Sequence, residues 1–259
     1  MLPFYHSRSG ENLSLTFQPH ETYQYSVKWK FLRLGTITIT RLDDGSDPNT
    51  LRVSMLVESN PSLPFVDIRE YNESLIDAAT LMTLEYYGDF RNKRSRKETR
   101  HIFDPDNEAV YHSEWDASTG ELMYADTVHN VSGFVNGPSL LSFARARSCS
   151  GNVIDVPTFV RGSVANTRLD FTPGVREISI SSWPFPVRVR KYNGIADWEG
   201  GTSQGLSGNF TGWVSDDFAA IPIRAEMKVL IGSVRIELES WDRPDWTPST
   251  ARRLAEKQL

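Results

Sequence analysis

Cysteine is nearly absent from this chain of 259 residues, whose one thiol belongs to Cys149. A single cysteine cannot form an internal disulfide, and it cannot build a thiolate cluster around a metal. A chain of this length buries roughly 70–75% of the surface that it exposes when unfolded, which is enough for a core without cross-links. We therefore expect a fold that side-chain packing holds together.

Long apolar runs and an excess of positive charge are missing as well. No run approaches the ~20 apolar residues that a helix needs to span a bilayer, so we expect no membrane-spanning helix. The 28 Lys and Arg residues face 33 Asp and Glu residues, and the formal net charge of −5 argues against a dedicated nucleic-acid-binding protein. With 39% hydrophobic and 24% charged residues, the composition is that of a globular protein and excludes wholesale disorder.

Motifs of catalysis and cofactor binding are also lacking. The sequence has no Walker loop, no dinucleotide fingerprint and no Gly-x-Ser-x-Gly elbow. The histidines show neither H-x-H nor H-x-x-x-H spacing, and single histidines on a sheet surface are commoner than a zinc site built from distant strands. They are His6, His20, His101, His112 and His129. We therefore expect no metal, no cofactor and no catalytic residue.

The adjacent carboxylates of Asp216 and Asp217 come closest to a reactive site. They could serve a metal or acid–base chemistry, but a tight turn before a strand also uses aspartate side chains to bond its backbone. The sequence offers no third ligand or acid–base partner nearby. The turn is therefore the favoured interpretation. A hydrolase that uses either aspartate is the least favoured function, and it would gain support if His101 or His112 lay within hydrogen-bond reach.

What the sequence has in abundance is apolar residues at alternate positions, the pattern of half-buried strands. The clearest cases are residues 221–229 and 234–239, which are apolar on one side and charged on the other. One internal helix is predicted over 138–147, with Pro138 in its first turn. Many strands joined by hairpin-length links favour an antiparallel meander over a βαβ fold. Further strands are predicted at 23–31, 37–39, 51–57, 65–76, 81–90, 93–103, 110–111, 122–128, 152–161, 168–171, 175–182 and 186–192, and a loop at the glycine-rich residues 200–208.

Several segments carry a family resemblance through their order and spacing. They are Tyr23 to Trp29 leading to Leu34-Gly35-Thr36, Phe65 to Asp77, the basic strand ending Ile102-Phe103-Asp104, Trp213 to Asp217, Ile221 to Arg224 and Leu230 to Val234. Over about residues 10–240 the chain resembles the bacterial domain-of-unknown-function family numbered 3108. The resemblance implies an exported protein of the periplasm or cell envelope, built on a long antiparallel sheet curled into a partial barrel. It implies no established activity.

The expected fold is thus all-β: a long antiparallel meander sheet curled into a partial barrel, with one short internal helix and one short C-terminal helix. Residues 1–240 are expected to form a single β-rich domain, and residues 241–259 a C-terminal tail. The start of the chain lacks the basic and apolar regions of a secretory signal, which on its own indicates the cytoplasm. A chain numbered after signal removal would look the same.

An aromatic strand face is the first candidate binding site. Tyr23, Tyr25, Trp29 and Phe31 alternate with polar residues and could line a cavity for an acyl chain or a saccharide. A filled core would use the same side chains. An open meander has one concave face that no second sheet covers, so its apolar residues need a helix, a ligand or a partner.

A basic strand is the second candidate. Its functional interpretation is contact with an anionic polymer or lipid headgroup, and the alternative is a charged strand that deters edge pairing. The residues are Arg91, Lys93, Arg94, Arg96, Lys97 and Arg100.

The C-terminal tail is the third candidate. Trp241 and Trp246 precede a short helix predicted over 248–258, and they could dock on a partner protein or fold back on their own sheet.

Taken together, these features predict a non-catalytic cell-envelope protein that binds an apolar or amphipathic ligand, a lipid or glycan, or a partner chain on its curved sheet. The alternative is a structural subunit of a larger protein assembly that docks through the C-terminal tail. The least favoured function is a hydrolase.

Overall fold

The computed structural model describes residues 10–43, 47–63, 67–160, 162–196, 208–228 and 233–249. Two helices, α1 (Gly10–Thr16) and α2 (Gly137–Arg147), accompany fifteen strands. The first eight strands are β1 (Thr22–Trp29), β2 (Leu32–Leu42), β3 (Thr50–Ser59), β4 (Ile68–Asp77), β5 (Thr83–Asn92), β6 (Arg96–Asp104), β7 (Ala109–Asp116) and β8 (Glu121–His129). The others are β9 (Val153–Val160), β10 (Ser163–Asp170), β11 (Val175–Ile178), β12 (Val187–Ala196), β13 (Gly208–Ser215), β14 (Pro222–Lys228) and β15 (Ser233–Asp242).

All fifteen strands belong to one antiparallel sheet, in the order β8-β7-β6-β5-β4-β3-β2-β1-β15-β14-β13-β12-β10-β9, with β11 beside β12. The first and last strands pair in the middle of this order, where Tyr23 lies opposite Trp241. The sheet therefore consists of two meanders that grow outward from the β1–β15 seam. Strands β8 and β9 form its two edges, so the sheet is not closed.

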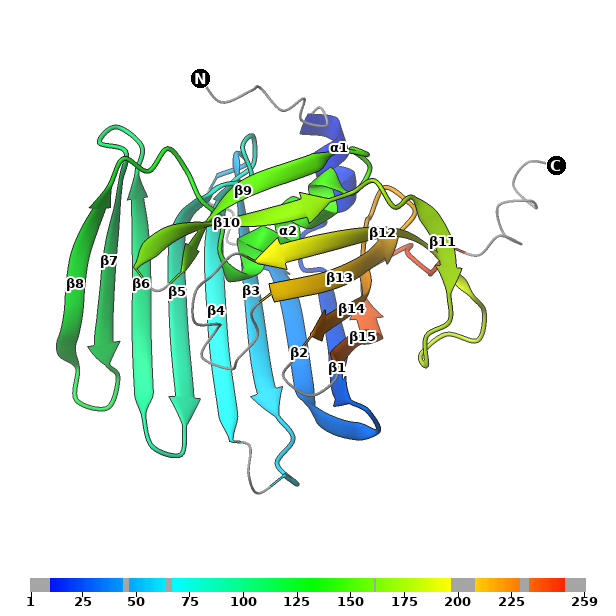
Figure 1. Ribbon diagram of the computed structural model, residues 1–259, viewed down its shortest axis with the longest axis horizontal. Coiled ribbons are helices and arrows are strands. Elements are labelled where there is room, and N and C mark those ends of the chain that lie inside the picture. The colour runs from blue at the N-terminus through cyan, green and yellow to red at the C-terminus, as the bar shows by residue number, and fades with distance from the viewer. Residues whose placement is uncertain are drawn as a thin grey trace.

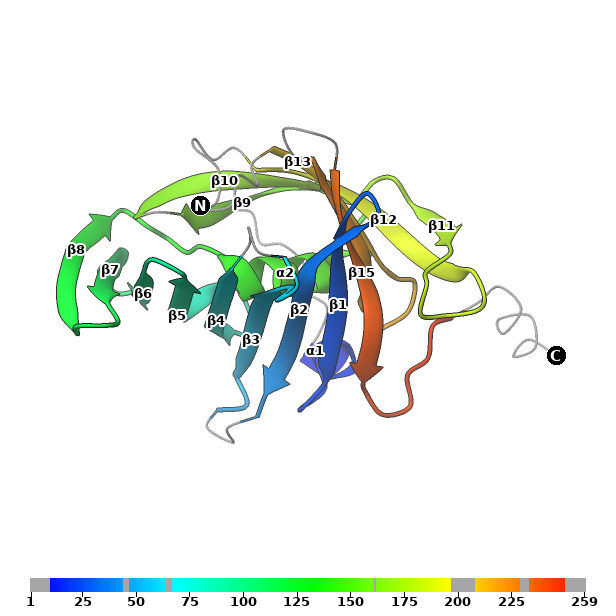
Figure 2. The same cartoon turned by 90° about the horizontal axis from the view of Figure 1, so that it is seen from below.

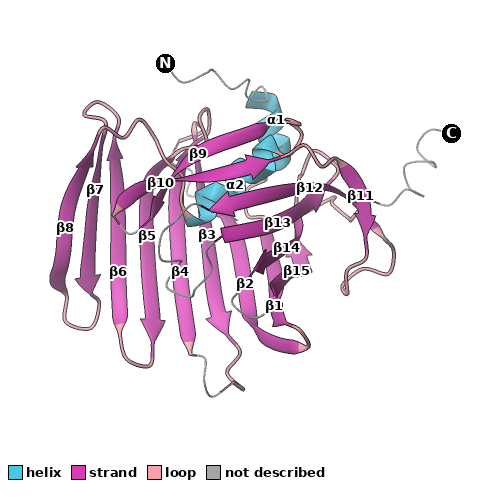
Figure 3. Cartoon of the chain, in the orientation of Figure 1, coloured by secondary structure: helices cyan, strands magenta, loops and turns pink. Residues whose placement is uncertain are grey.

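The sheet curls around helix α2 (Figure 1). Seen from below, strands β9, β10 and β12 pass on one side of α2 and strands β2 to β5 lie on the other (Figure 2). The two helices are the only ones among the described residues, and α2 lies inside the curl (Figure 3). This arrangement confirms the predicted all-β antiparallel meander. Helix α2 covers part of the concave face, whose apolar side chains would otherwise face solvent.

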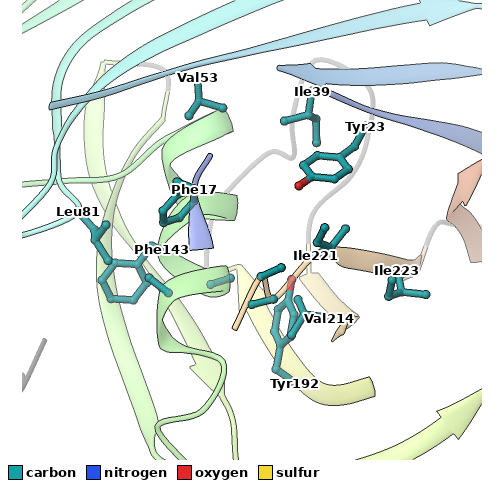
Figure 4. Close-up of a cluster of buried hydrophobic side chains, with 14 of the residues drawn as sticks. Phe17, Tyr23, Ile39, Val53, Leu81, Phe143, Tyr192, Val214, Ile221 and Ile223 are labelled. Carbon is teal, nitrogen blue, oxygen red and sulfur yellow. The ribbon is translucent and has the colours of Figure 1, made fainter. Parts of the chain in front are cut away.

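The main core fills the space between the helix and the two meanders. Figure 4 shows Phe143 of α2 beside Phe17 and Leu81, with Tyr192 and Val214 of the second meander facing Ile221. These side chains are at least nine-tenths buried. Burial of a large apolar side chain contributes about 1.5–3 kcal/mol, so this cluster accounts for a fold without disulfides or metal.

The chain differs from the sequence prediction at several elements. Strand β13 and helix α1 were not expected, and the strand predicted at 168–171 is part of the longer β10. Gly208 at the start of the strand and Gly212 between Phe210 and Trp213 break the alternation, so the pattern does not predict β13. The predicted helix 248–258 and the glycine-rich segment 200–208 lie almost wholly outside the described residues. No helix in the described part of the chain is long and apolar enough to cross a bilayer.

Candidate functional site

A cavity of about 180 Å³ lies between helix α2 and the second meander. Leu140, Leu141 and Ala144 form its helical wall. The opposite wall comes from strands β10, β12, β13 and β14, and its side chains are almost all apolar. They include Leu169, Tyr192, Ala196, Phe210, Ala225 and Met227.

The sheet wall of the cavity is built from two rows of neighbouring residues that cross the strands. In the first row, Leu169 lies opposite Gly194, which lies opposite Phe210, which in turn lies opposite Met227. In the second row, Tyr192, Gly212 and Ala225 follow one another. Because side chains on one face of a sheet align across strands, each row presents one continuous apolar strip to the helix.

A glycine stands beside an aromatic residue in each row. A Cβ atom placed on Gly194 would lie 2.0 Å from Cζ of Phe210, and one placed on Gly212 would lie 2.2 Å from Cζ of Tyr192. The two rings therefore rest on the backbone of the neighbouring strand. A glycine inside a strand often marks such a close approach. Rings that lie against the sheet leave the space above them open, and this space is the cavity.

Helix α2 is fixed firmly over the cavity. It begins with Pro138 in its first turn, and the backbone N–H of Asn136 donates a hydrogen bond of 2.7 Å to Oγ of Ser139, as in a capping box. The Ser139 hydroxyl also meets that of Thr83 on β5 at 2.7 Å. These contacts attach the start of the helix to the first meander.

The other end of α2 is held by a buried ion cluster. Arg145 donates to Oε1 of Glu21 at 2.8 Å and to the carbonyl oxygen of Thr16 at 2.6 Å. Arg243 donates to the second Glu21 oxygen, and the Tyr23 hydroxyl donates to the same oxygen at 2.9 Å. Burial is the main cause that raises the pKa of Tyr23 to about 12, so its hydroxyl stays protonated. A buried charge needs such partners, and the cluster joins α1, α2 and the chain after β15.

Two histidines of the first meander contact strand β9 of the second meander. His101 of β6 and His112 of β7 are buried, with ring centroids 4.9 Å apart, and both rings face Phe159 of β9. Gly162, between β9 and β10, lies against the His112 ring. Burial, followed by the nearby His112 and Lys97, lowers the pKa of His101 to about 3. Burial also lowers the pKa of His112. Both imidazoles are therefore neutral parts of the contact between the two meanders.

The predicted aromatic face is divided between the core and the surface. Tyr23 and Tyr25 are buried in the main core, away from the cavity wall. Trp29 is partly buried under Nζ of Lys30, and Phe31 is 95% exposed in the β1–β2 turn. Lys30 has a φ of 53°, which turns the chain before Phe31. The structure therefore does not bring these four side chains together, and their role in binding stays a prediction.

The basic strand lies in the β5–β6 hairpin and is partly neutralised. Arg96 pairs with Asp89 at 2.9 Å, Lys97 pairs with Glu114 at 3.0 Å, and the guanidinium of Arg100 lies over the rings of Tyr87 and Trp115. The other three residues are exposed near the turn. They are Arg91, Lys93 and Arg94. Contact with an anionic partner stays a prediction.

The tail tryptophans fold back on their own sheet. Trp241 is part of β15, and Trp246 is 9% exposed with its ring centroid 5.4 Å from that of Trp241. The indole N–H of Trp246 donates to Oδ2 of Asp217 at 3.0 Å. The boundary predicted after residue 240 therefore falls inside a strand. Trp246 is thus buried within its own chain while Trp241 stays partly exposed, and docking of the tail on a partner stays a prediction.

Asp216 and Asp217 have the structural roles expected of a turn. Oδ1 of Asp217 accepts hydrogen bonds from the Ser215 hydroxyl at 2.7 Å and from the backbone N–H of Ala219 at 3.0 Å. Asp216 forms ion pairs with Arg188 and Arg190. The neighbours of His101 and His112 are instead Phe159, Asn136 and Glu114. Within the described ranges, no group of three His, Cys, Asp or Glu side chains could hold a metal ion.

A repeated sequence pattern indicates the close ring contacts of the cavity wall. Tyr192-Asn193-Gly194 and Phe210-Thr211-Gly212 both place an aromatic residue two positions before a glycine, on the same face of a strand. Two such strands paired side by side put each ring over the glycine of the other. The pairing itself joins β12 to β13 and becomes visible only in the structure.

The comparisons with known proteins concern fold and family. A family model described as "Protein of unknown function (DUF3108)" matches residues 24–239. A search of curated proteins finds no match. The crystal structure of a beta-barrel-like protein of the domain of unknown function DUF1849 from Brucella abortus is similar, with a TM-score of 0.57, 8% identity, and coverage of 87% of this chain and 98% of that chain.

A second structure, of the hypothetical protein CT021 from Chlamydia trachomatis, has a TM-score of 0.36 and 11% identity, and the match covers 95% of this chain and 98% of that one. At 8% identity the Brucella structure bears on the fold alone. The Brucella protein supports the description of the curled sheet as barrel-like.

Proposed function

We propose that this chain, which belongs to the DUF3108 family of proteins of unknown function, is a non-catalytic binding protein for an apolar or amphipathic ligand. The ligand enters the cavity between helix α2 and strands β10 to β14. The site predicted on the aromatic strand β1 is replaced here by the cavity, because the cavity has open volume and the β1 face does not gather its four aromatic residues.

The observation that carries this proposal is the apolar cavity that the two glycine–aromatic pairs keep open. A dry apolar cavity of roughly 150 Å³ accommodates a benzene ring in an engineered protein, so about 180 Å³ accommodates a ring or the end of an acyl chain. Each buried methylene contributes about 0.8 kcal/mol. Open space against apolar side chains forfeits dispersion contacts in a protein interior, and a bound apolar group would supply them.

Two further features support a binding role over a chemical one. The carboxylate of Asp217, near the second meander, already accepts hydrogen bonds from the backbone N–H of Ala219 and from the indole N–H of Trp246. Three polar residues, Tyr192, Asn209 and Lys228, stand among the apolar residues that line the cavity. Burial raises the pKa of Tyr192 to about 12, so this phenol stays neutral near pH 7 and is a poor base.

We propose the periplasm or cell envelope as the location of this binding protein. The support for this location is the family resemblance. Fractionation of cells that express the full-length gene product tests it, and recovery with the cytoplasmic fraction would contradict it.

Titration of the purified protein with an environment-sensitive apolar fluorophore tests the binding role. We expect saturable binding that Ala225→Leu weakens, because the larger side chain occupies part of the cavity. The matched control is Ala125→Leu on the exposed strand β8, which adds the same atoms away from the cavity. Equal binding by all three proteins would show that the fluorophore binds elsewhere.

A further inference from the structure

The links between the strands of the first meander, β1 to β8, lie alternately at two opposite ends of the sheet. Because neighbouring strands run antiparallel, the links β1–β2, β3–β4, β5–β6 and β7–β8 share one end. Figure 1 shows this end along the lower edge of the sheet. The links β2–β3, β4–β5 and β6–β7 share the other end, on the side of helix α1.

The charged residues of these links differ in sign between the two ends. The lower end carries three basic residues and one acidic residue, which are Lys30, Lys93, Arg94 and Asp67. The other end carries five acidic residues and no basic one; they are Asp43, Asp44, Asp47, Asp106 and Glu108. The lower end, called the basic end below, is therefore positive although the whole chain has a formal net charge of −5. An uneven distribution of this kind orients a protein at a charged surface.

The basic end also presents a large apolar side chain to solvent. Phe31 is 95% exposed in the β1–β2 link, directly after the exposed Lys30. Single exposed apolar residues are common on protein surfaces. A ring beside cations, however, suits the interface of a membrane, where apolar side chains enter the acyl boundary and cations meet anionic headgroups.

We propose that the basic end of the first meander docks on an anionic phospholipid surface, with the Phe31 ring among the lipids and the cations of this end beside the headgroups. The strands of the first meander then run away from the membrane, and the acidic end faces away from it. This orientation limits the repulsion between the surface and a protein of negative net charge. The inference does not depend on the cavity beneath α2.

The same cations would also attract a soluble anionic polymer. A polymer of this kind, such as polyphosphate, has no apolar interior that could take up the Phe31 ring. The exposed ring therefore favours a lipid surface over a polymer, and the two partners differ in what the loss of the ring should do.

Co-sedimentation with vesicles separates the charge from the ring. We expect the wild-type protein to bind vesicles of phosphatidylcholine mixed with phosphatidylglycerol, to bind vesicles of phosphatidylcholine alone much more weakly, and to lose affinity as salt is added. Arg94→Gln should weaken binding to the anionic vesicles about fivefold. Phe31→Ala should weaken it about tenfold. Both side chains are exposed, so circular dichroism should show that the variants keep the fold.

The chain offers a matched control for each variant. Arg176→Gln removes an exposed cation from β11 of the second meander. Phe218→Ala removes a ring that is 64% exposed beside α1, where the carbonyl oxygen of Phe218 accepts a hydrogen bond of 2.9 Å from Thr16. Neither control should change the affinity for the anionic vesicles.

An environment-sensitive dye reports insertion directly. The dye is attached at Phe31→Cys in a Cys149→Ser background, since the Cys149 thiol is exposed. Its emission should shift to the blue when anionic vesicles are added. The same dye at Phe218→Cys should show no shift.

Several outcomes would overturn the inference. Equal binding to the two kinds of vesicle, binding that Phe31→Ala leaves unchanged, or a dye at Phe31→Cys that does not respond would each show that the basic end does not insert into an anionic membrane. Binding of polyphosphate with the same affinity by the wild-type protein and Phe31→Ala, without binding to vesicles, would identify a polymer as the partner. Failure to bind vesicles and polyphosphate alike would refute docking through this end altogether.

Discussion

Replacing Gly194 by alanine probes the feature that shapes the cavity. The new Cβ atom would lie 2.0 Å from Cζ of Phe210, a distance at which one of the two strands or the ring must move. Overpacking of this kind costs about 1–3 kcal/mol. Alanine would otherwise gain about 0.5–1 kcal/mol over glycine inside a strand, so we expect Gly194→Ala to lower the free energy of unfolding by about 1–2 kcal/mol.

A double-mutant cycle isolates the contact. In a Phe210→Ala background the obstructing ring is absent, and Gly194→Ala should become neutral or stabilise the protein by about 0.5–1 kcal/mol. Urea unfolding at constant pH measures all four proteins, and an unchanged m-value shows that only stability has altered. The second pair, Gly212→Ala with Tyr192→Ala, should behave in the same way, because its contact is 2.2 Å.

The cycle refutes the reasoning if Gly194→Ala costs the same in both backgrounds to within about 0.5 kcal/mol. That result would mean that the ring does not rest on the backbone at Gly194. The floor of the cavity would then have a different shape from the one described.

Three further predictions concern the supports of the site. The free energy of unfolding should fall as the pH drops from about 6.5 toward 3. The folded-state pKa of His101 is about 3 and that of His112 is lowered, so in this range the unfolded chain binds protons that the folded chain does not. The denaturation midpoint should depend less steeply on pH in the double variant His101→Phe/His112→Phe, and an unchanged dependence would contradict the assignment. Glu21→Gln should destabilise the protein by about 3–5 kcal/mol, since it leaves Arg145 and Arg243 buried without their carboxylate; a thermal shift no larger than that of the exposed control Glu121→Gln would argue against the cluster. Trp246→Ala should cost about 3–5 kcal/mol in urea unfolding, whereas an unaltered midpoint would show that the Trp246 ring contributes nothing to the stability of the fold.

Local pattern was enough for most of the strands. Alternation over 221–229 and 234–239 predicted β14 and β15, and Pro138 marked the start of α2, because each signal depends on neighbours in the sequence. The pairing of β1 with β15 joins residues more than 200 positions apart. No local pattern contains that information, so the seam of the sheet came from the structure, although the curled antiparallel sheet itself was expected from the family resemblance.

The candidate site was harder to predict because alternation identifies a face and not its surroundings. Tyr23 and Phe31 share the period of two, yet the turn at Lys30 puts Phe31 in solvent while Tyr23 enters the ion cluster around Glu21. The cavity depends on which strands pair and on glycines opposite aromatic rings. In the sequence, Gly194 and Gly212 only indicate positions that weaken a strand. Their contact with aromatic rings is visible only once the residues on the paired strand are known.

Extraction of the protein from cells that express it naturally, followed by mass spectrometry of the extract, tests most directly whether this cavity holds a ligand. Our account predicts a stoichiometric apolar or amphipathic ligand in the wild-type extract, a marked loss of it from Ala225→Leu, and its retention by Ala125→Leu. An extract free of amphiphiles, together with a crystal structure in which the chain's own side chains fill the space beneath α2, would contradict it.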